Sequence, residues 1–210
     1  MERTRLYIAR HGQVTNYNEY RYNGHNDVDI TETGHEQMHK LAEFISEPIA
    51  AVYSSDLIRS HKGGKIIADK HDVPHHSSEK LRELSLGRWE GLTREEAHEK
   101  YPEESHISFL DLATERLKGG ESFIDLQARI LPEVKAILDK HKGETVFMLL
   151  HGLVNRVILC NAMGTGIENF FTIEQDFGCV NIIDYFHDGI TVVKMANGGP
   201  NQTITKPLLY

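Results

Sequence analysis

Residues 5–12 read Arg-Leu-Tyr-Ile-Ala-Arg-His-Gly, a short apolar run that ends on a histidine and a glycine. An apolar run of this length predicts a buried strand, and the glycine predicts a loop directly after it. Residues 145–152, Thr-Val-Phe-Met-Leu-Leu-His-Gly, show the same arrangement. Because this second run has no polar alternation, it is typical of a central strand in a parallel sheet with both faces covered.

The segments between and after these two strands alternate between helical and strand patterns. Thr33 and Glu36 have the spacing of a capping box, and Ser54-Ser55-Asp56 is a typical helix start. Apolar periodicity predicts helices over about 33–47, 54–70, 123–138 and 153–163, and strands at 50–53, 179–186 and 190–196. This alternation predicts an α/β fold, a three-layer α/β/α sandwich with a mostly parallel central sheet.

The length of 210 residues predicts one domain over residues 1–210. Thr93 and Glu96 have a second capping-box spacing and open a polar helix. We therefore expect a helical insertion over the core at about residues 93–118. Cys160 and Cys179 lie in apolar or glycine-flanked surroundings without Cys-x-x-Cys spacing, which predicts buried free thiols.

The formal net charge of −8 argues against nucleic acid or an anionic membrane as a partner, because such partners require a basic field over the docking face. An anionic substrate must then meet a local cluster of arginine and histidine. No apolar stretch approaches the roughly 20 residues that span a bilayer, and residues 1–4 lead into a strand without a signal-peptide pattern. We expect a cytoplasmic protein.

Two histidines, His11 and His151, directly follow the two apolar strands. Because ligands of open α/β sheets lie beyond the carboxyl ends of the strands, we expect the two imidazoles side by side. Gly152 opens the next helix and can direct its N–H at an anion. Arg10 precedes His11, and Arg59 lies one turn into the helix after the second strand. Such a cluster suits a phosphoryl group, because guanidiniums match its oxygens and stabilise the transition state.

Several short motifs accompany these residues in a fixed order along the chain. They are Leu6–Gln13 around Arg-His-Gly, Ser54–Arg59, Leu81–Glu83, Gly87–Gly91, Gly119–Ser122 and His151–Gly152. Each motif alone is common, but their order over nearly the whole chain is much more specific. In this order they resemble the motifs of the histidine phosphatase (phosphoglycerate mutase-like) superfamily, in its phosphatase branch.

The resemblance implies a phosphomonoesterase that hydrolyses a small phosphorylated metabolite, with no cofactor and no metal ion. It assigns His11 as the nucleophile that becomes transiently phosphorylated. It assigns Glu83 as the general acid for the leaving oxygen and then as the base that activates water. Contacts to the phosphoryl group are expected from Arg10, Gln13, Asn16, Arg59, Glu83, His151 and Gly152.

Some details qualify these assignments. His11 must be neutral at its attacking nitrogen, so we expect its other ring nitrogen to donate to a backbone carbonyl. Glu90 is a rival to Glu83 as the acid. Val14 stands where many members have threonine, and Asn16 lies one residue closer to the nucleophile than the family's usual asparagine.

Three alternative functions remain open. A phosphoglycerate mutase would return the phosphoryl group to the substrate. Such mutases resemble one another in a longer segment after the catalytic glutamate, which contains Arg-His-Tyr-Gly. Segment 84–91 of this chain is shorter and resembles the phosphatase form. A zinc metalloprotease is suggested by His35, Glu36 and His39, which satisfy H-E-x-x-H on a predicted helix, although no third ligand follows at a known spacing. A non-catalytic phosphate-binding protein is opposed by the retained nucleophile, acid and second histidine.

The expected partner is a small-molecule phosphate ester. α-Ribazole 5'-phosphate, sugar phosphates and phosphoglycerates are all admissible. Specificity is expected from the insertion and from the loop residues Tyr20, Tyr22, Arg82 and Arg88, because loops carry specificity on a fixed scaffold. A homodimer is an admissible assembly.

Overall fold

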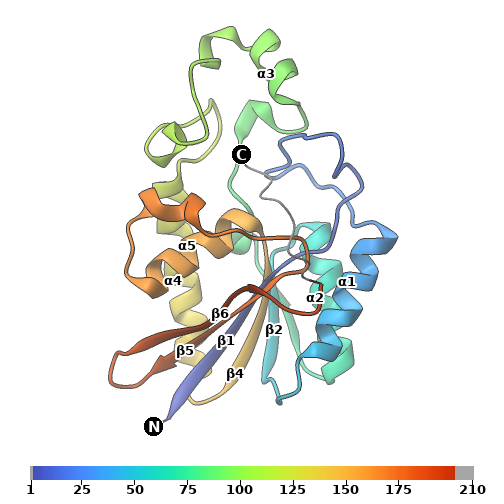
Figure 1. Cartoon of the computed structure of the whole chain (residues 1–210), viewed down its shortest axis with the longest axis vertical. Coiled ribbons are helices and arrows are strands. Elements are labelled where there is room, and N and C mark those ends of the chain that lie inside the picture. Colours follow the sequence, from blue (N-terminus) through green and yellow to red (C-terminus); the bar gives the residue numbers. More distant parts are fainter. Residues whose placement is uncertain (1, 202–210) are drawn as a thin grey trace.

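The structure, a computed structural model, describes residues 2–201. Its centre is a six-stranded sheet in the order β3-β2-β4-β1-β5-β6 (Figure 1). The strands are β1 (Arg3–Arg10), β2 (Ala51–Ser54), β3 (His75–Ser77), β4 (Thr145–Leu150), β5 (Val180–Phe186) and β6 (Thr191–Gly198). Strands β1 to β4 pair in parallel, whereas β5 and β6 are antiparallel to their neighbours. The predicted α/β fold with a mostly parallel sheet is confirmed.

Helices cover both faces of this sheet. They are α1 (Glu32–Phe44), α2 (Ile58–His71), α3 (Arg94–Lys100), α4 (Phe123–Lys140) and α5 (Gly152–Met163). Helices α1 and α2 lie on one face and α4 and α5 on the other, while α3 lies beyond the end of the sheet (Figure 1). The three layers of the predicted sandwich are therefore present.

The two central strands hold the layers together by alternating their side chains. Leu6 and Ile8 of β1 belong to the apolar core beneath α4 and α5, whereas Tyr7 and Ala9 belong to the core beneath α1 and α2. Every residue of β4 is buried, as predicted for a strand covered on both faces. Because both strands end at the same edge of the sheet, the residues that follow them meet there.

One predicted helix start differs from the structure, and one short strand was not predicted. Helix α1 begins at Glu32, and its N-cap is Thr31, whose Oγ1 accepts a hydrogen bond from the N–H of Gly34 at 3.0 Å. The expected cap at Thr33 lies inside this first turn. Strand β3 was not predicted, because it has three residues and two of them are histidines.

The segment Ser54-Ser55-Asp56 does not begin helix α2. Ser54 completes β2, the side chain of Ser55 binds His151, and Asp56 pairs with Arg82. The helix starts only at Ile58. These side chains are occupied by distant partners, so they are not free to cap the helix.

Residues 93–118, here called the cap, form the end of the molecule opposite the start of β1 (Figure 1). The capping box at Thr93 is present, and short 3₁₀ turns follow α3. The buried carboxylate of Glu104 accepts hydrogen bonds from the side chains of Trp89 and Arg88, both at 2.9 Å. Residues 93–118 are thus anchored on the segment that precedes them, and Trp89 is a buried packing residue.

Cys160 and Cys179 are buried and unpaired, as predicted. Within residues 2–201, no helix combines the length and the apolarity that a membrane crossing requires.

Candidate active site

His11 lies directly after β1 and only 5% of its surface is exposed. Its Nδ1 lies 2.9 Å from the carbonyl oxygen of Gly12, so Nδ1 carries the proton and Nε2 keeps a free electron pair. Burial and the charges of Arg59 and Arg10 hold the pKa of His11 well below its usual value. The imidazole is therefore neutral at pH 7, in the tautomer that a nucleophilic Nε2 requires.

His151, which directly follows β4, is fully buried beside His11. The two ring centroids lie 5.2 Å apart in an edge-on arrangement, so the structure brings together the two histidines paired from the sequence. Nε2 of His151 lies 2.6 Å from the hydroxyl oxygen of Ser55, whereas Nδ1 has no hydrogen-bond partner within the described residues. Burial, Arg59 and His11 keep the pKa of His151 well below its usual value.

Arg59 is a buried cation next to these histidines, with 2% of its surface exposed. Its two terminal nitrogens donate to the carbonyl oxygens of Asn26 at 2.9 Å and Gly24 at 2.6 Å. Burial lowers its pKa to about 10, so the guanidinium remains charged at neutral pH. The loop that carries Gly24 and Asn26 therefore sets the direction of this side chain.

Arg10 and Gly152 form the adjoining part of the site. Arg10 donates to the carbonyl oxygen of Gln175 at 2.6 Å and lies over the ring of Phe177, 3.9 Å from its centroid. Gly152 is the first residue of α5, where N–H groups have no acceptor within the helix. A Cβ at Gly152 would lie 3.7 Å from nitrogens of both Arg10 and Arg156. The start of α5 thus lies between two guanidiniums.

Glu83 is the carboxylate of the cavity that contains His11. Its Oε2 accepts from the N–H of Leu153 in the first turn of α5 at 3.1 Å, and its Oε1 accepts from the N–H of Leu84 at 2.9 Å. Glu90, the rival acid, accepts hydrogen bonds from two backbone N–H groups of neighbouring loops and does not line the cavity. The geometry favours Glu83 over Glu90.

The structure does not bring Gln13 and Asn16 to the cavity. The side-chain oxygen of Gln13 accepts from the hydroxyl of Thr31 at 3.0 Å, because the chain turns toward α1 after His11. Asn16 forms reciprocal amide hydrogen bonds with Asn23 at 2.8 and 3.1 Å. Asn23, and not Asn16, lines the cavity. The expected contacts of Gln13 and Asn16 with the phosphoryl group therefore receive no support.

The cavity has a volume of about 220 Å³ and contains several residues that were not assigned from the sequence. Of these, Arg156 lies four residues after Gly152 on α5, so helical spacing alone places it on the same face. Its Nε donates to the carbonyl oxygen of Ile173 at 2.7 Å. The other unassigned residues, apart from Leu153 of α5, reach the cavity through the paths of their loops, which local periodicity does not predict. The unassigned lining residues are Arg21, Asn23, Gly24, Leu86, Phe109, Leu153, Arg156 and Phe177.

A second, mainly apolar cavity of about 130 Å³ lies beneath the cap. It shares Tyr22, Leu86 and Phe109 with the first cavity. The rings of Tyr22 and Phe109 stack with centroids 6.2 Å apart. The wall that the two cavities share is therefore aromatic and aliphatic. Of the loop residues expected to set specificity, only Tyr22 lies in either cavity.

The zinc hypothesis finds no support in the described part of the chain. His35 is half-buried on α1, and Glu36 and His39 are exposed. Within residues 2–201, no group of three or more His, Cys, Asp or Glu side chains is placed to hold a metal ion. His35 and His39 thus lack a third ligand.

The cavity is strongly cationic although the whole chain is acidic. Among residues 2–201, four arginines and one carboxylate line it. Guanidiniums fixed by backbone carbonyls do not need to reorganise when an anion binds. Together with a neutral, nucleophilic imidazole, these residues define a site for transfer of a phosphoryl group.

The chain belongs to the histidine phosphatase superfamily, branch 1, whose family model matches residues 6–198. The superfamily resemblance of the sequence motifs is confirmed.

Three relatives illustrate the similarity. The bifunctional protein Rv2228c of Mycobacterium tuberculosis is 30% identical over 196 residues, which are 92% of this chain and 54% of that protein. The chain thus spans about half the length of this curated relative. The metal-independent phosphoserine phosphatase of Arabidopsis thaliana is 35% identical over 161 residues, 75% of this chain and 68% of that protein. The solved structure of Bacillus stearothermophilus YhfR has a TM-score of 0.83 and 30% identity, and covers 91% of this chain and 95% of its own.

Proposed function

We propose that this protein hydrolyses a phosphate monoester of a small metabolite through a phosphohistidine on His11, without a metal ion. The observation that carries the proposal is the hydrogen bond from Nδ1 of His11 to the carbonyl oxygen of Gly12. This bond keeps the electron pair of Nε2 free in a cavity that also contains Arg10, Arg59 and Glu83. A nucleophile, cationic donors and an acid are the parts that this chemistry requires.

In the first half of the reaction, Nε2 of His11 attacks phosphorus and the bond from phosphorus to the alcohol oxygen breaks. Glu83 gives its proton to that oxygen, so the alcohol leaves neutral. Arg10 and Arg59 bind the remaining phosphoryl oxygens, whose negative charge is spread over the transition state. The products of this half are the alcohol and phosphohistidine.

In the second half, water hydrolyses the phosphohistidine. The Glu83 carboxylate removes a proton from water as the water oxygen attacks phosphorus, and the bond between phosphorus and Nε2 breaks. Inorganic phosphate leaves, His11 returns to its neutral form and Glu83 is again protonated. Each group thus ends the cycle in its starting state.

The names of relatives support this reaction class. Phosphoserine phosphatases of Hydrogenobacter thermophilus and Arabidopsis thaliana are among them. The cavity size, about 220 Å³, supports a small phosphate ester as the substrate. The predominance of arginine over carboxylate supports an anionic group at its centre.

The test is p-nitrophenyl phosphate hydrolysis by the wild type, His11→Ala and His11→Asn, each with excess EDTA. We expect EDTA-resistant turnover in the wild type and a loss of more than about 10³-fold in both variants, as for removal of a nucleophile. Wild type denatured in alkali during turnover should contain protein-bound phosphate that is stable in alkali and released by acid, as expected of phosphohistidine, and neither variant should form it. EDTA-sensitive turnover would contradict the metal-independent mechanism.

The same samples separate the alternatives. Interconversion of 2- and 3-phosphoglycerate without release of inorganic phosphate would establish the mutase. Phosphate binding without turnover of any ester would establish the non-catalytic protein.

A further inference from the structure

Glu83 belongs to a segment without regular secondary structure, between the 3₁₀ turns Glu79–Leu81 and Gly87–Trp89. A general acid must nevertheless hold its carboxyl group within hydrogen-bond reach of the leaving oxygen. Misplacement by about 1 Å can cost about 100-fold in rate. Some other part of the fold must therefore fix this segment.

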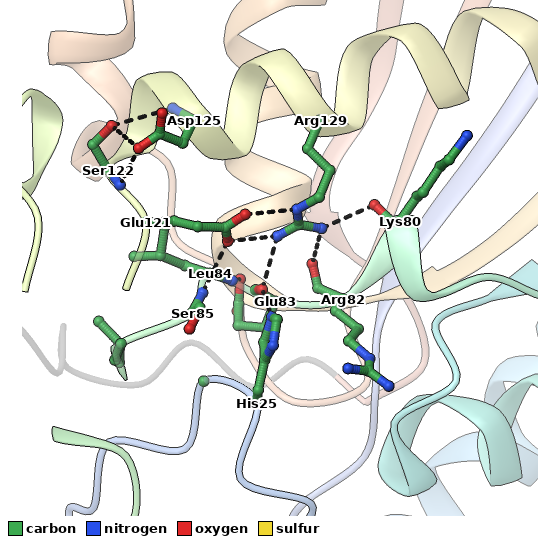
Figure 2. Close-up of polar contacts among 12 residues, drawn as sticks. His25, Lys80, Arg82, Glu83, Leu84, Ser85, Glu121, Ser122, Asp125 and Arg129 are labelled. Carbon is green, nitrogen blue, oxygen red and sulfur yellow. Dashed lines mark hydrogen bonds and ion pairs between the residues drawn. The ribbon is translucent and has the colours of Figure 1, made fainter. Parts of the chain in front are cut away.

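Arg129 on α4 holds the backbone of this segment (Figure 2). One terminal nitrogen donates to the carbonyl oxygens of Lys80 and Arg82, both at 2.9 Å, and the other donates to that of Glu83 at 3.0 Å. Three carbonyls within four residues thus bind one guanidinium. A guanidinium offers five donors in a rigid plane, which suits this task, whereas the ammonium of lysine does not.

Glu121 completes the arrangement by fixing Arg129. Its two oxygens accept from Nε and a terminal nitrogen of Arg129 at 2.8 and 2.7 Å, so all five guanidinium donors are used. Glu121 also accepts from the N–H of Ser85 at 3.0 Å. Both side chains of the pair are about one-fifth exposed, so solvent screens the pair only in part. Residues on both sides of Glu83 are therefore attached to the start of α4.

The other end of Glu83 is attached to a different helix. The side-chain carboxylate of Glu83 accepts a hydrogen bond from the N–H of Leu153 on α5. The backbone carbonyl oxygen of Glu83 also lies 2.8 Å from Nε2 of His25. Glu83 thus spans the space between α4 and α5. Arg129 does not line the cavity, so it does not contact the substrate.

We propose that Arg129, held by Glu121, is a positioning residue that places Glu83 for protonation of the leaving alcohol. This inference rests on the proposed function, since it assigns Glu83 as the acid. The Arg129–Glu121 pair does more than a surface ion pair does, because it binds the backbone of the segment that carries Glu83. Loss of the Arg129–Glu121 pair therefore displaces the carboxyl group of Glu83 and leaves Arg10 and Arg59 in place.

The test compares two substrates in Arg129→Lys and Arg129→Met. p-Nitrophenolate leaves without help from an acid, whereas the alkoxide of β-glycerophosphate requires a proton. We compare kcat/KM, because it includes only the steps up to departure of the alcohol and excludes phosphohistidine hydrolysis. We expect kcat/KM for β-glycerophosphate to fall by about 100-fold, that for p-nitrophenyl phosphate by less than about 3-fold, and the inhibition constant of inorganic phosphate to stay unchanged.

Two further variants sharpen the comparison. Arg116→Met is the matched control, because Arg116 also pairs with a carboxylate of α4, Asp125 at 2.6 Å, but is 62% exposed and away from Glu83. It should leave the ratio of the two kcat/KM values unchanged. Glu83→Gln combined with Arg129→Lys should be no slower on β-glycerophosphate than Glu83→Gln alone, because both changes remove the same step.

A purely structural role predicts another pattern. If Arg129→Lys and Arg129→Met lower both kcat/KM values equally, in line with a lower melting temperature, the positioning role is wrong while the proposed function stands. If the wild type hydrolyses neither substrate, the proposed function fails and the positioning role fails with it.

Discussion

The floor and the roof of the catalytic cavity are built by different kinds of contact. The floor consists of the lining residues His11 and Arg59 together with His151, which does not itself line the cavity but packs against His11. Each of the three is at most 5% exposed and is tied by a directional hydrogen bond. The roof contains Tyr22 and Phe109, which are half-buried and stack on each other. Hydrogen bonds demand one geometry, whereas apolar contacts are non-directional. The floor is therefore suited to one chemistry and the roof to selection among alcohols.

The largest effect outside the nucleophile is expected at Arg59. Arg59→Met removes a buried cation from the floor, so kcat/KM for every phosphate ester should fall by about 10²- to 10³-fold, and inorganic phosphate should inhibit less. Steady-state kinetics and phosphate inhibition measure this. Arg82→Met is the control, because Arg82 pairs with Asp56 and does not line the cavity. An effect confined to one substrate would place Arg59 with the roof.

Glu83→Gln should reveal its role through the leaving group. Loss of the acid should reduce kcat/KM for alkyl phosphates by about 10²-fold or more, and much less for p-nitrophenyl phosphate. A series of esters with alcohols of increasing pKa measures the slope. Equal activity of Glu83→Gln and wild type on an alkyl phosphate would show that Glu83 is not the acid.

Ser55→Ala should weaken the floor indirectly. It leaves Nε2 of the buried His151 without its hydrogen bond, which costs about 1–3 kcal/mol of folding free energy. We expect a drop of about 10-fold in kcat/KM from the loosened imidazole. Urea unfolding and kinetics measure the two effects. An unchanged variant would mean that packing alone orients His151.

Acidification should destabilise the floor. His11 and His151 have pKa values well below the usual 6.5, so below about pH 6.5 the unfolded chain binds protons that the folded protein does not. The contribution of these two histidines to stability is therefore constant above about pH 7 and falls as the pH drops from 6.5 to 5, by up to about 1.4 kcal/mol per unit for each histidine. Unfolding free energies for wild type and His11→Asn test this. The variant should show the shallower dependence.

The smallest effect is expected at the roof. Phe109→Ala should raise KM for aryl phosphates by about 3- to 10-fold and leave KM for β-glycerophosphate within about 2-fold, because it removes only apolar contact. Phe44→Ala, at a side chain outside both cavities, is a control. Equal losses on both substrates would remove the distinction between floor and roof.

Several features were accessible from the sequence because they depend on local pattern. The fully apolar run that became β4 predicted a central strand, and β1 and β4 each end directly before a histidine and a glycine. Parallel pairing then brings His11 and His151 together without further information. The reason for glycine at position 12, in contrast, appears only in the tertiary structure, because a Cβ there would collide with the carbonyl oxygen of Gly34 on α1.

Other features required the tertiary structure, because they join residues far apart along loops. Ser55 meets His151 across 96 positions, and Arg129 meets Lys80 across 49. No local periodicity encodes such contacts. The loop after β1 likewise leaves the side chain of Asn16 bound to that of Asn23, and it is Asn23 that lines the cavity.

The sequence by itself thus determined the α/β class, the two central strands β1 and β4, the two strand-end histidines, and Arg10 and Arg59 beside them. These follow from the periods of strands and helices and from the rule that parallel strands end at one edge. The tertiary structure alone decided which amide lines the cavity, which carboxylate faces His11 and what holds that carboxylate in place. Those outcomes depend on loop paths, which are set by hydrogen bonds to distant backbone groups.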